Sequence, residues 1–506
     1  MQDNNNALIV FEKLLYTIST GSNEFNKYII KNVEELYHFT AQERDFLLTT
    51  IEDCLDEING WRLFPQRNRV LIFILKKMQF REQTLRMLVS EMEYCETFSE
   101  KMDSFWKLSI QLFYWNEASS ETITNGAFKY LVNIALDQLP KAIQHQKSED
   151  SIDILIVVQQ FIFGNHSPSL EVADYAKTLI SLGRKVEILI TNEMIGRQDK
   201  FWDYQTNGND ELIGRHVINI DGHNIPITGI KQDQSLENIF STIKSLVSTC
   251  PKLVISVGCH CIYSELLGYY TKLITIPTSL GFYYSINSDI ILWFSGDRSR
   301  LGSIRRQYDL FLPIIITDLE YQYIAPKTVN LLSRDELKVE PHDKIGVIVG
   351  NRLEADIDDE FIKFLTLLID TKFISIIIVG ELSAEKKQRL SEIGGESISF
   401  IKFQPNLVDL FGAVDFFLNP KRLGGGTTAA HALSAGLLVF SLRFGDVSNI
   451  SLVEHTFDDY DQMLNIINIL KDDCLVNSYR DKCKLRFSEI SDRKYFIQRL
   501  LKIARV

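Results

Sequence analysis

One segment near the end of the chain constrains the fold more than any other, because it places a run of glycines between two apolar stretches. Residues 414–418 and 437–442 are short apolar runs of the kind that form buried strands. Between them, Gly424, Gly425 and Gly426 precede a helical stretch of small residues. A helix that connects two such strands is typical of a parallel α/β sheet, so this segment predicts one.

The glycine turn also predicts a chemical property. Glycines without Cβ atoms allow a ligand to approach the backbone closely. The unpaired amides of the first helical turn, with the hydroxyls of Thr427 and Thr428, suit a phosphate or diphosphate, and the helix dipole adds roughly 0.3–1 kcal/mol. Arg422 lies just before the turn and could supply counter-charge. The alternative is a tight turn that lets an alanine-rich helix pack close to the sheet.

Composition limits the class of protein. The chain has 506 residues, enough for two or three domains, with 45% hydrophobic and 24% charged residues, as in globular proteins. Its net charge of −12 argues against broad nucleic-acid binding and against docking on an anionic membrane. The seven cysteines are scattered and predict no disulfide framework, and the 259–261 segment is too compact for a zinc site, so we expect no metal.

The N-terminal residues lack the features of a signal peptide, and no stretch approaches 18 consecutive apolar residues. We therefore expect a cytoplasmic protein without a membrane span.

The hydrophobic pattern divides the chain into three parts. Residues 1–148 carry apolar residues at helical spacing and predict an all-helical domain. Recognition of an acceptor or partner and bracing of the other two domains are both open as its role. Residues 149–335 and 336–506 alternate strand-like and helical patterns and predict two Rossmann-like domains. Asp221-Gly222 predicts a hairpin within the first of them.

Ligands of open parallel sheets bind at the carboxyl ends of the strands, so the loops that follow the strands are the candidate binding sites. In the second α/β domain, Asn351 and Arg352 follow a strand at 345–349, and an arginine there can hold a diphosphate through paired hydrogen bonds. A surface salt bridge with Glu354 or Asp356 is the alternative. Gln404 follows another strand, in a loop whose backbone fits either contact with a base or ribose or a simple connector.

Two histidines follow strands of the first α/β domain. His166 stands before Ser167 and Pro168, a good start for a helix, which places it at the sheet edge that faces the other domain. Histidine is well suited to proton transfer near neutral pH, so His166 is the first candidate for a catalytic base and His260 the second. For both, the alternative is a histidine or neighbouring glycine that only shapes its loop.

Taken together, these features resemble one known family. The segment 414–448, and in it the glycine-threonine run 425–428 followed by 435–440, resembles the donor-binding signature of GT-B glycosyltransferases, in particular O-GlcNAc-transferase-like and bacterial protein glycosyltransferases. The likeness covers roughly 150–506. It implies two facing Rossmann-like domains (GT-B), here preceded by the all-helical domain.

The resemblance implies roles by position. Gly424 to Thr428 would bind the diphosphate of a nucleotide-sugar donor, with a UDP-sugar favoured, and Arg352 would neutralise the leaving group without a metal. Asn351 and Gln404 would belong to further donor loops. The nucleotide sugar would be a co-substrate and no separate cofactor is implied. The acceptor would be a hydroxyl or amide, with a protein as one candidate, and assembly with like or unlike chains is compatible with this.

One residue departs from the family pattern. GT-B proteins often carry an acid five places before the glycine at Gly436, where it holds the ribose, and this chain has His431 there. The paired glutamates of retaining families, eight apart, would fall on Leu423 and His431, which disfavours that subgroup. His431 as a ribose contact and an unusual donor both stay open.

Two other functions share this architecture. One is a non-catalytic GT-B-like partner subunit of a glycosylation complex, supported by the histidine at 431. The other is a nucleotide-sugar epimerase. A dehydrogenase is disfavoured because no Gly-x-Gly-x-x-Gly motif follows an early strand.

Overall fold

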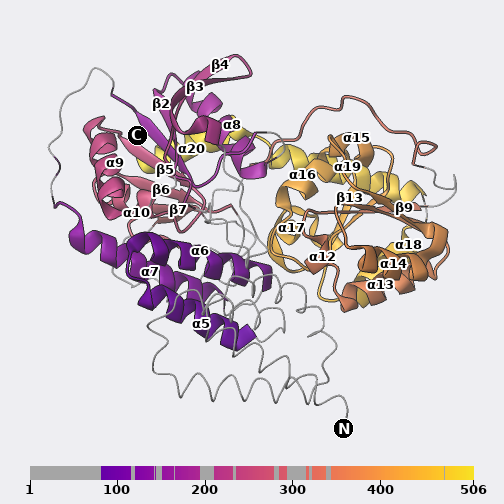
Figure 1. Ribbon diagram of the computed structural model, residues 1–506. Helices are drawn as coiled ribbons and strands as arrows, with labels where there is room; N and C mark the ends of the chain where they lie inside the picture. The colour runs from indigo at the N-terminus through magenta and orange to yellow at the C-terminus, as the bar shows by residue number, and fades with distance from the viewer. Residues whose placement is uncertain are drawn as a thin grey trace, which may run out of the picture.

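The computed structural model describes residues 81–115, 120–141, 143, 151–163, 166–193, 210–231, 235–278, 284–292, 315–317, 322–337, 344–471 and 473–506. These residues form a small group of helices and two β-sheets, each covered by helices (Figure 1). We call the sheet of residues 154–317 with its helices the first lobe, and the sheet of residues 344–457 with its helices the second lobe.

The helical group comprises α5 (Arg81–Tyr94), α6 (Phe98–Trp115) and α7 (Ser120–Gln138), which lie beneath the first lobe in Figure 1. Phe105 and Phe128 are fully buried, and they share one apolar core with Leu266 and Leu267 of the first lobe. These helices therefore pack on the first lobe rather than standing apart from it. Residues 1–80 lie outside the described residues, so the all-helical domain as a whole stays a prediction.

The first lobe is built on an eight-stranded sheet with the order β3-β4-β2-β1-β5-β6-β7-β8. Its strands are β1 (Ile154–Val158), β2 (Val186–Ile190), β3 (Gly214–Ile220), β4 (His223–Gly229), β5 (Leu253–Val257), β6 (Leu273–Ile276), β7 (Ile290–Leu292) and β8 (Ile315–Thr317). Its helices are α8 (Ser167–Ser181), α9 (Leu236–Ser248), α10 (Ile262–Gly268) and the 3-10 turn η2 (Asp210–Leu212). Neighbouring strands are parallel except β3 and β4, which form the hairpin predicted at Asp221-Gly222.

The second lobe is built on a six-stranded parallel sheet with the order β11-β10-β9-β12-β13-β14. Its strands are β9 (Lys344–Val349), β10 (Ile374–Val379), β11 (Ile398–Ile401), β12 (Phe416–Leu418), β13 (Leu438–Leu442) and β14 (Thr456–Phe457). Its helices are α12 (Leu353–Asp356), α13 (Asp359–Ile369), α14 (Ala384–Gly394), α15 (Leu407–Phe411), α16 (Gly426–Ser434), α17 (Gly445–Ile450), α18 (Tyr460–Ile469), α19 (Asp473–Glu489), and the 3-10 turns η3 (Gly395–Ser397) and η4 (Val453–His455). Two α/β lobes with parallel-dominated sheets confirm the predicted fold class.

The chain connects the lobes at two places. The first is the segment 322–337, where the amide of Tyr323 donates to the carbonyl of Ile490 at 2.7 Å. The second is α20 (Arg493–Ala504), which follows α19 of the second lobe but packs on α8 of the first, with Tyr175 and Phe496 stacked at 5.9 Å. The sequence predicts that α20 belongs to the domain of residues 336–506. Its apolar face instead covers α8, and the predicted boundaries near 148 and 335 stay predictions.

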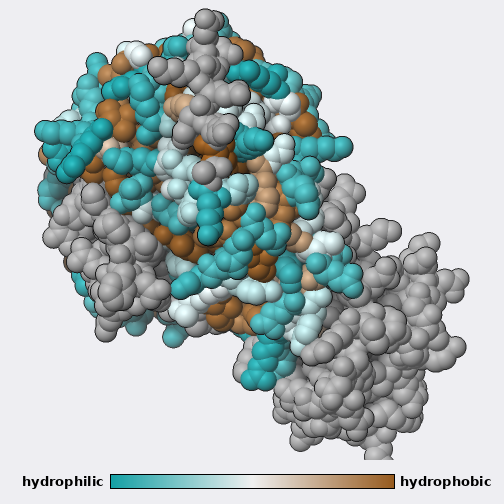
Figure 2. Space-filling model, turned by 90° about the vertical axis from the view of Figure 1, so that its left-hand side faces the viewer, coloured by the Kyte–Doolittle hydropathy of each residue, from teal (hydrophilic) through white to brown (hydrophobic). Residues whose placement is uncertain are grey.

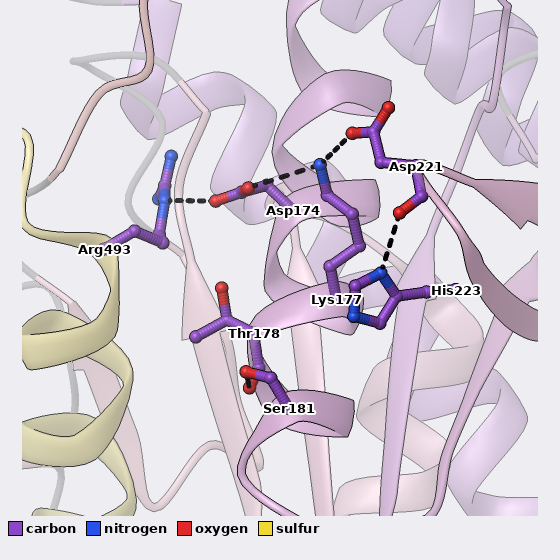
Figure 3. A network of polar contacts seen from close by, with 7 residues as sticks. All are labelled: Asp174, Lys177, Thr178, Ser181, Asp221, His223 and Arg493. Atoms are coloured by element: carbon purple, nitrogen blue, oxygen red, sulfur yellow. Dashed lines mark hydrogen bonds and ion pairs between the residues drawn. The ribbon is translucent and has the colours of Figure 1, made fainter.

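Ion pairs fix this packing of α20 (Figure 3). Arg493, only 7% exposed, places its Nε 3.0 Å from Asp174 of α8. Asp174 also lies 3.7 Å from Lys177, which in turn binds Asp221 of the β3–β4 hairpin at 2.7 Å. One chain of alternating charges thus ties the last helix to the first lobe.

The outer face of the first lobe mixes hydrophilic and hydrophobic residues, as Figure 2 shows from the side. Within the described ranges, no helix has both the length and the apolarity to cross a membrane.

Candidate functional site

The glycine turn adopts a backbone that its glycines permit. Gly425, at the N-terminal end of α16, has φ 109°, in the region that favours glycine. A Cβ on Gly425 would lie 3.0 Å from the Arg422 guanidinium, and one on Gly426 would lie 3.1 Å from both Tyr323 Oη and Asp446 Cβ. Close packing therefore accounts for these two glycines. A Cβ on Gly424 would meet only Arg352, with Nη2 at 3.4 Å.

The amino end of α16 has backbone amides whose hydrogen bonds no described residue accepts. The amide of Ala429 makes the first hydrogen bond into this helix, to the carbonyl of Gly425 at 3.1 Å. The amides of 426–428 precede that bond, and no side chain of the described residues caps the helix. Thr427 and Thr428 are half-buried there. The turn thus combines tight packing on its inner side with amide donors at its helix end.

Two arginines lie beside the turn. Arg422 is 4% exposed; its Nε donates to Asn419 Oδ1 at 2.8 Å, and its Nη1 lies 3.4 Å from Asp356. Its Nη2 is buried and makes no hydrogen bond to any residue that the structure describes. Burial lowers the pKa of Arg422 and Asp356 opposes this, so the guanidinium stays charged. Arg352 approaches the turn from the end of β9, at Gly424.

The other predicted donor residues of the second lobe lie on neighbouring loops. Asn351 is exposed in the loop that carries Arg352. Of the two acids considered as partners of Arg352, Asp356 pairs with Arg422, and Glu354 accepts the amide of Ser383 at 2.8 Å. Gln404 is half-buried and donates to the carbonyl of Asn406 at 3.1 Å, which shapes the loop after β11. Their donor role stays a prediction.

His431 contacts the segment between the lobes. Its Nε2 lies 3.0 Å from the carbonyl oxygen of Ile324, which fits a protonated Nε2 because a carbonyl only accepts. Burial lowers the pKa of His431 to about 4, so the ring is neutral near pH 7. This nitrogen is therefore engaged with the chain itself, which disfavours Nε2 as a ribose contact.

His166 lies where the lobes meet. It occupies the N-cap position of α8, and the next residue, Ser167, places its Oγ 2.6 Å from Thr427 Oγ1 of α16. The N-terminal ends of α8 and α16, one from each lobe, are thereby in contact. Burial lowers the pKa of His166 below its ordinary value, which favours a neutral ring. The structure thus brings His166 together with the glycine turn.

His260 has different surroundings. It is 3% exposed and lies against the rings of Phe128 at 5.1 Å and Tyr284 at 5.9 Å. Its Nε2 is 2.8 Å from Asn125 Oδ1 of α7, and burial lowers its pKa to about 3. His260 joins the helical group to the end of β5, and the structure does not bring it to the glycine turn.

Sequence reasoning missed a polar cluster at the lobe contact. Tyr323 and Asp446 pack directly against Gly426, and both are buried. Burial raises the pKa of Glu171 on α8 to about 8, while Arg493 lowers it and Asp446 and Asp174 raise it further. The available signal was the spacing of Ser167, Glu171 and Asp174 on one side of α8, but a polar helical face ordinarily indicates solvent.

In the part of the chain that the structure describes, no three His, Cys, Asp or Glu side chains gather as a metal site would require.

Comparisons with known proteins find similarity only at the level of structure. No family model matches the chain, and no curated protein matches its sequence. A mutant of the Thermobaculum terrenum O-GlcNAc transferase is 12% identical with a TM-score of 0.50, covering 95% of this chain and 96% of that chain. Anabaena HepE in complex with UDP is 13% identical with a TM-score of 0.50, covering 70% of this chain and 100% of that chain. This likeness establishes the GT-B fold.

Proposed function

We propose that the protein is a cytoplasmic glycosyltransferase that moves a sugar from a nucleoside diphosphate, favoured to be UDP, to an acceptor, of which a protein is one candidate. The observation that carries this is the contact of two helix N-termini from opposite lobes. Ser167 at the start of α8 lies 2.6 Å from Thr427 at the start of α16. Two arginines lie beside the same turn, Arg352 near Gly424 and Arg422 near Gly425.

Electrostatics favours an anion at this junction. Each helix N-terminus carries roughly half a positive elementary charge, and two such ends in contact repel one another. Neither end has a capping side chain among the described residues. A diphosphate beside this contact would offset the repulsion and accept hydrogen bonds from the amides at the start of α16. Each helix end would contribute roughly 0.3–1 kcal/mol toward such an anion.

The same arrangement suits sugar transfer. The bond between the sugar C1 and the diphosphate oxygen breaks, and its electron pair remains on the diphosphate. The acceptor oxygen or nitrogen forms a new bond to C1 and releases its proton to water or to a base. Charge that develops on the leaving diphosphate would be stabilised by amides and guanidinium groups already in place. Because these groups supply counter-charge, we propose that the reaction needs no metal and no cofactor besides the nucleotide sugar.

The structural neighbours support the donor class. One is named an O-GlcNAc transferase and the other was solved in complex with UDP. Their likeness to this chain is one of fold, so the donor and the reaction remain our proposal.

Titration calorimetry with UDP, ADP and GDP tests the proposal first. We expect UDP to bind with a dissociation constant on the order of micromolar to millimolar, as donor sites commonly do. UDP-glucose and UDP-N-acetylglucosamine, added singly, should then be hydrolysed slowly in the absence of acceptor. A protein that binds none of these nucleotides has no donor site, and the proposal would be abandoned.

The alternatives predict other outcomes of the same assays. A partner subunit would bind nucleotide or remain empty but show no turnover, and would copurify with a second protein. The hydrogen bond from His431 to Ile324 favours this candidate, because it occupies the residue that replaces the usual ribose-binding acid. An epimerase would interconvert the sugar of the donor without any acceptor.

A further inference from the structure

Among the residues that the structure describes, the ring of His166 has one hydrogen-bond partner, Ser169, three residues further along α8. Its Nδ1 lies 2.6 Å from Ser169 Oγ. Ser169 is 3% exposed, and its Oγ accepts the amide of Ile162 at 2.8 Å. The hydroxyl is therefore fixed between the loop after β1 and the histidine ring.

Counting protons decides the direction of the bond to His166. A serine hydroxyl has one proton and two lone pairs, and the amide of Ile162 occupies one lone pair. Within the described ranges, His166 Nδ1 is the one acceptor in reach of the hydroxyl proton. A buried hydroxyl without an acceptor costs about 1–3 kcal/mol, so Ser169 donates and Nδ1 accepts. In a neutral imidazole, the proton then resides on Nε2.

The neighbourhood keeps the ring neutral. Burial disfavours the imidazolium form of His166, and so does the positive end of α8, at which it stands. No described residue accepts a hydrogen bond from Nε2, so within the described ranges this N–H is available to a ligand.

We propose that Ser169 holds His166 as the Nε2–H tautomer, and that this N–H donates a hydrogen bond to the diphosphate of the donor. The second half rests on the proposed function. Ser169 is then a positioning residue, and His166 serves the leaving group rather than the acceptor. This replaces the role of catalytic base that the sequence suggested, because a nitrogen that carries a proton cannot accept another.

The assignment agrees with the rest of the junction. The amides at the start of α16, Arg352 and Arg422 are all donors, and a fourth donor from the opposite lobe completes a site for an anion. His166 precedes Ser167, whose hydroxyl touches Thr427, so both lobes would contact the same diphosphate.

Nitrogen-15 NMR of the histidine side chains in the ligand-free protein tests the tautomer near pH 7. We expect a pyrrole-like Nε2 and a pyridine-like Nδ1 for His166, assigned by the loss of its signals in His166→Gln. Ser169→Ala should mix the two tautomers, and Ser169→Thr, which retains the hydroxyl, should restore the original one. A protonated Nδ1 in the unaltered protein would overturn the proposal, whatever nucleotide the protein binds.

UDP affinity tests the donor role. His166→Gln places an amide N–H near the position of Nε2–H, so its affinity should stay within about 3-fold, whereas His166→Ala should bind about 10-fold more weakly. Equal losses in both variants would show that donation is not what the ring supplies. If the unaltered protein binds no UDP, the proposed function and the donor role fail together, while NMR still decides the tautomer.

Discussion

The loops that follow β1 and β5 each carry a histidine, but the histidine of each loop has different surroundings. Both strands lie side by side in the first sheet, and each is followed by a loop with a histidine at the start of a helix. After β1, His166 is half-buried and lies next to the amino end of α16. After β5, His260 is enclosed by aromatic rings and bonded to Asn125. What packs over a strand end, rather than the strand end itself, decides between a ligand site and a core.

The largest effect is expected from a substitution at the end of β5, which should lower stability without changing nucleotide affinity. His260→Ala removes a buried ring and leaves Asn125 without its partner, so we expect a loss of about 3 kcal/mol in the free energy of unfolding. Nucleotide affinity of the folded protein should not change. Denaturant unfolding and UDP calorimetry measure the two. His260→Asn retains a polar group toward Asn125 and should be less destabilising. Lost affinity with unchanged stability would reverse our assignment.

The opposite pattern is expected at the glycine turn. Arg352→Ala removes a charged donor beside Gly424, so UDP should bind about 10- to 100-fold more weakly, with a stability change below about 1 kcal/mol. Arg389→Ala is the matched control, because Arg389 is an exposed arginine of the same lobe that pairs with Asp359. Equal affinities in the two variants would move the nucleotide away from this turn.

A smaller effect concerns pH at the lobe contact. The pKa of Glu171 is raised from 4.5 to about 8, so the folded protein holds a proton there that the unfolded chain releases. Its contribution to stability is complete below about pH 4.5 and is lost as the pH rises through about 8. Arg493, Asp446 and Asp174 are the charged groups that face it.

Thermal unfolding between pH 5 and 9 measures this contribution. Glu171→Gln should reduce the loss of unfolding free energy between pH 5 and 9 by about 1 kcal/mol, once solvent screening is allowed for. Glu385→Gln, on the exposed side of α14, should leave the decline as it is. Parallel pH curves for the unaltered protein and Glu171→Gln would show that the proton is not held at the lobe contact.

The smallest effect is expected from chelation of metals. If amides and arginines alone neutralise the diphosphate, EDTA should leave both UDP affinity and turnover unchanged, and added Mg²⁺ or Mn²⁺ should restore nothing. A loss on chelation that Mn²⁺ reverses would place a metal among the groups at the junction.

Local patterns allowed the sequence to predict much of the architecture. Strand-like runs that alternate with helices predicted both parallel sheets, and the three glycines at 424–426 predicted the turn into α16. His166 was placed at the sheet edge because Ser167 and Pro168 start a helix beside it. Each of these predictions depends on residues that are close together in the sequence.

The features that the sequence did not predict depend on contacts between residues far apart in the chain. His260 is bonded to Asn125, 135 residues away, and His431 to Ile324, 107 residues away. The residues next to a histidine in the sequence do not show which distant helix or segment will pack against its ring. The Ser169 bond that sets the tautomer of His166 spans only three residues, yet it needs the amide of Ile162 to be fixed as well.

The position of α20 has a consequence for how the chain matures. The last helix covers Tyr175 of α8, although more than 300 residues of chain separate them. During synthesis, the apolar surface of α8 that α20 covers therefore stays exposed until α20 has left the ribosome. The first lobe therefore completes its packing only after the second lobe has been synthesised, because α20 follows the second lobe in the chain.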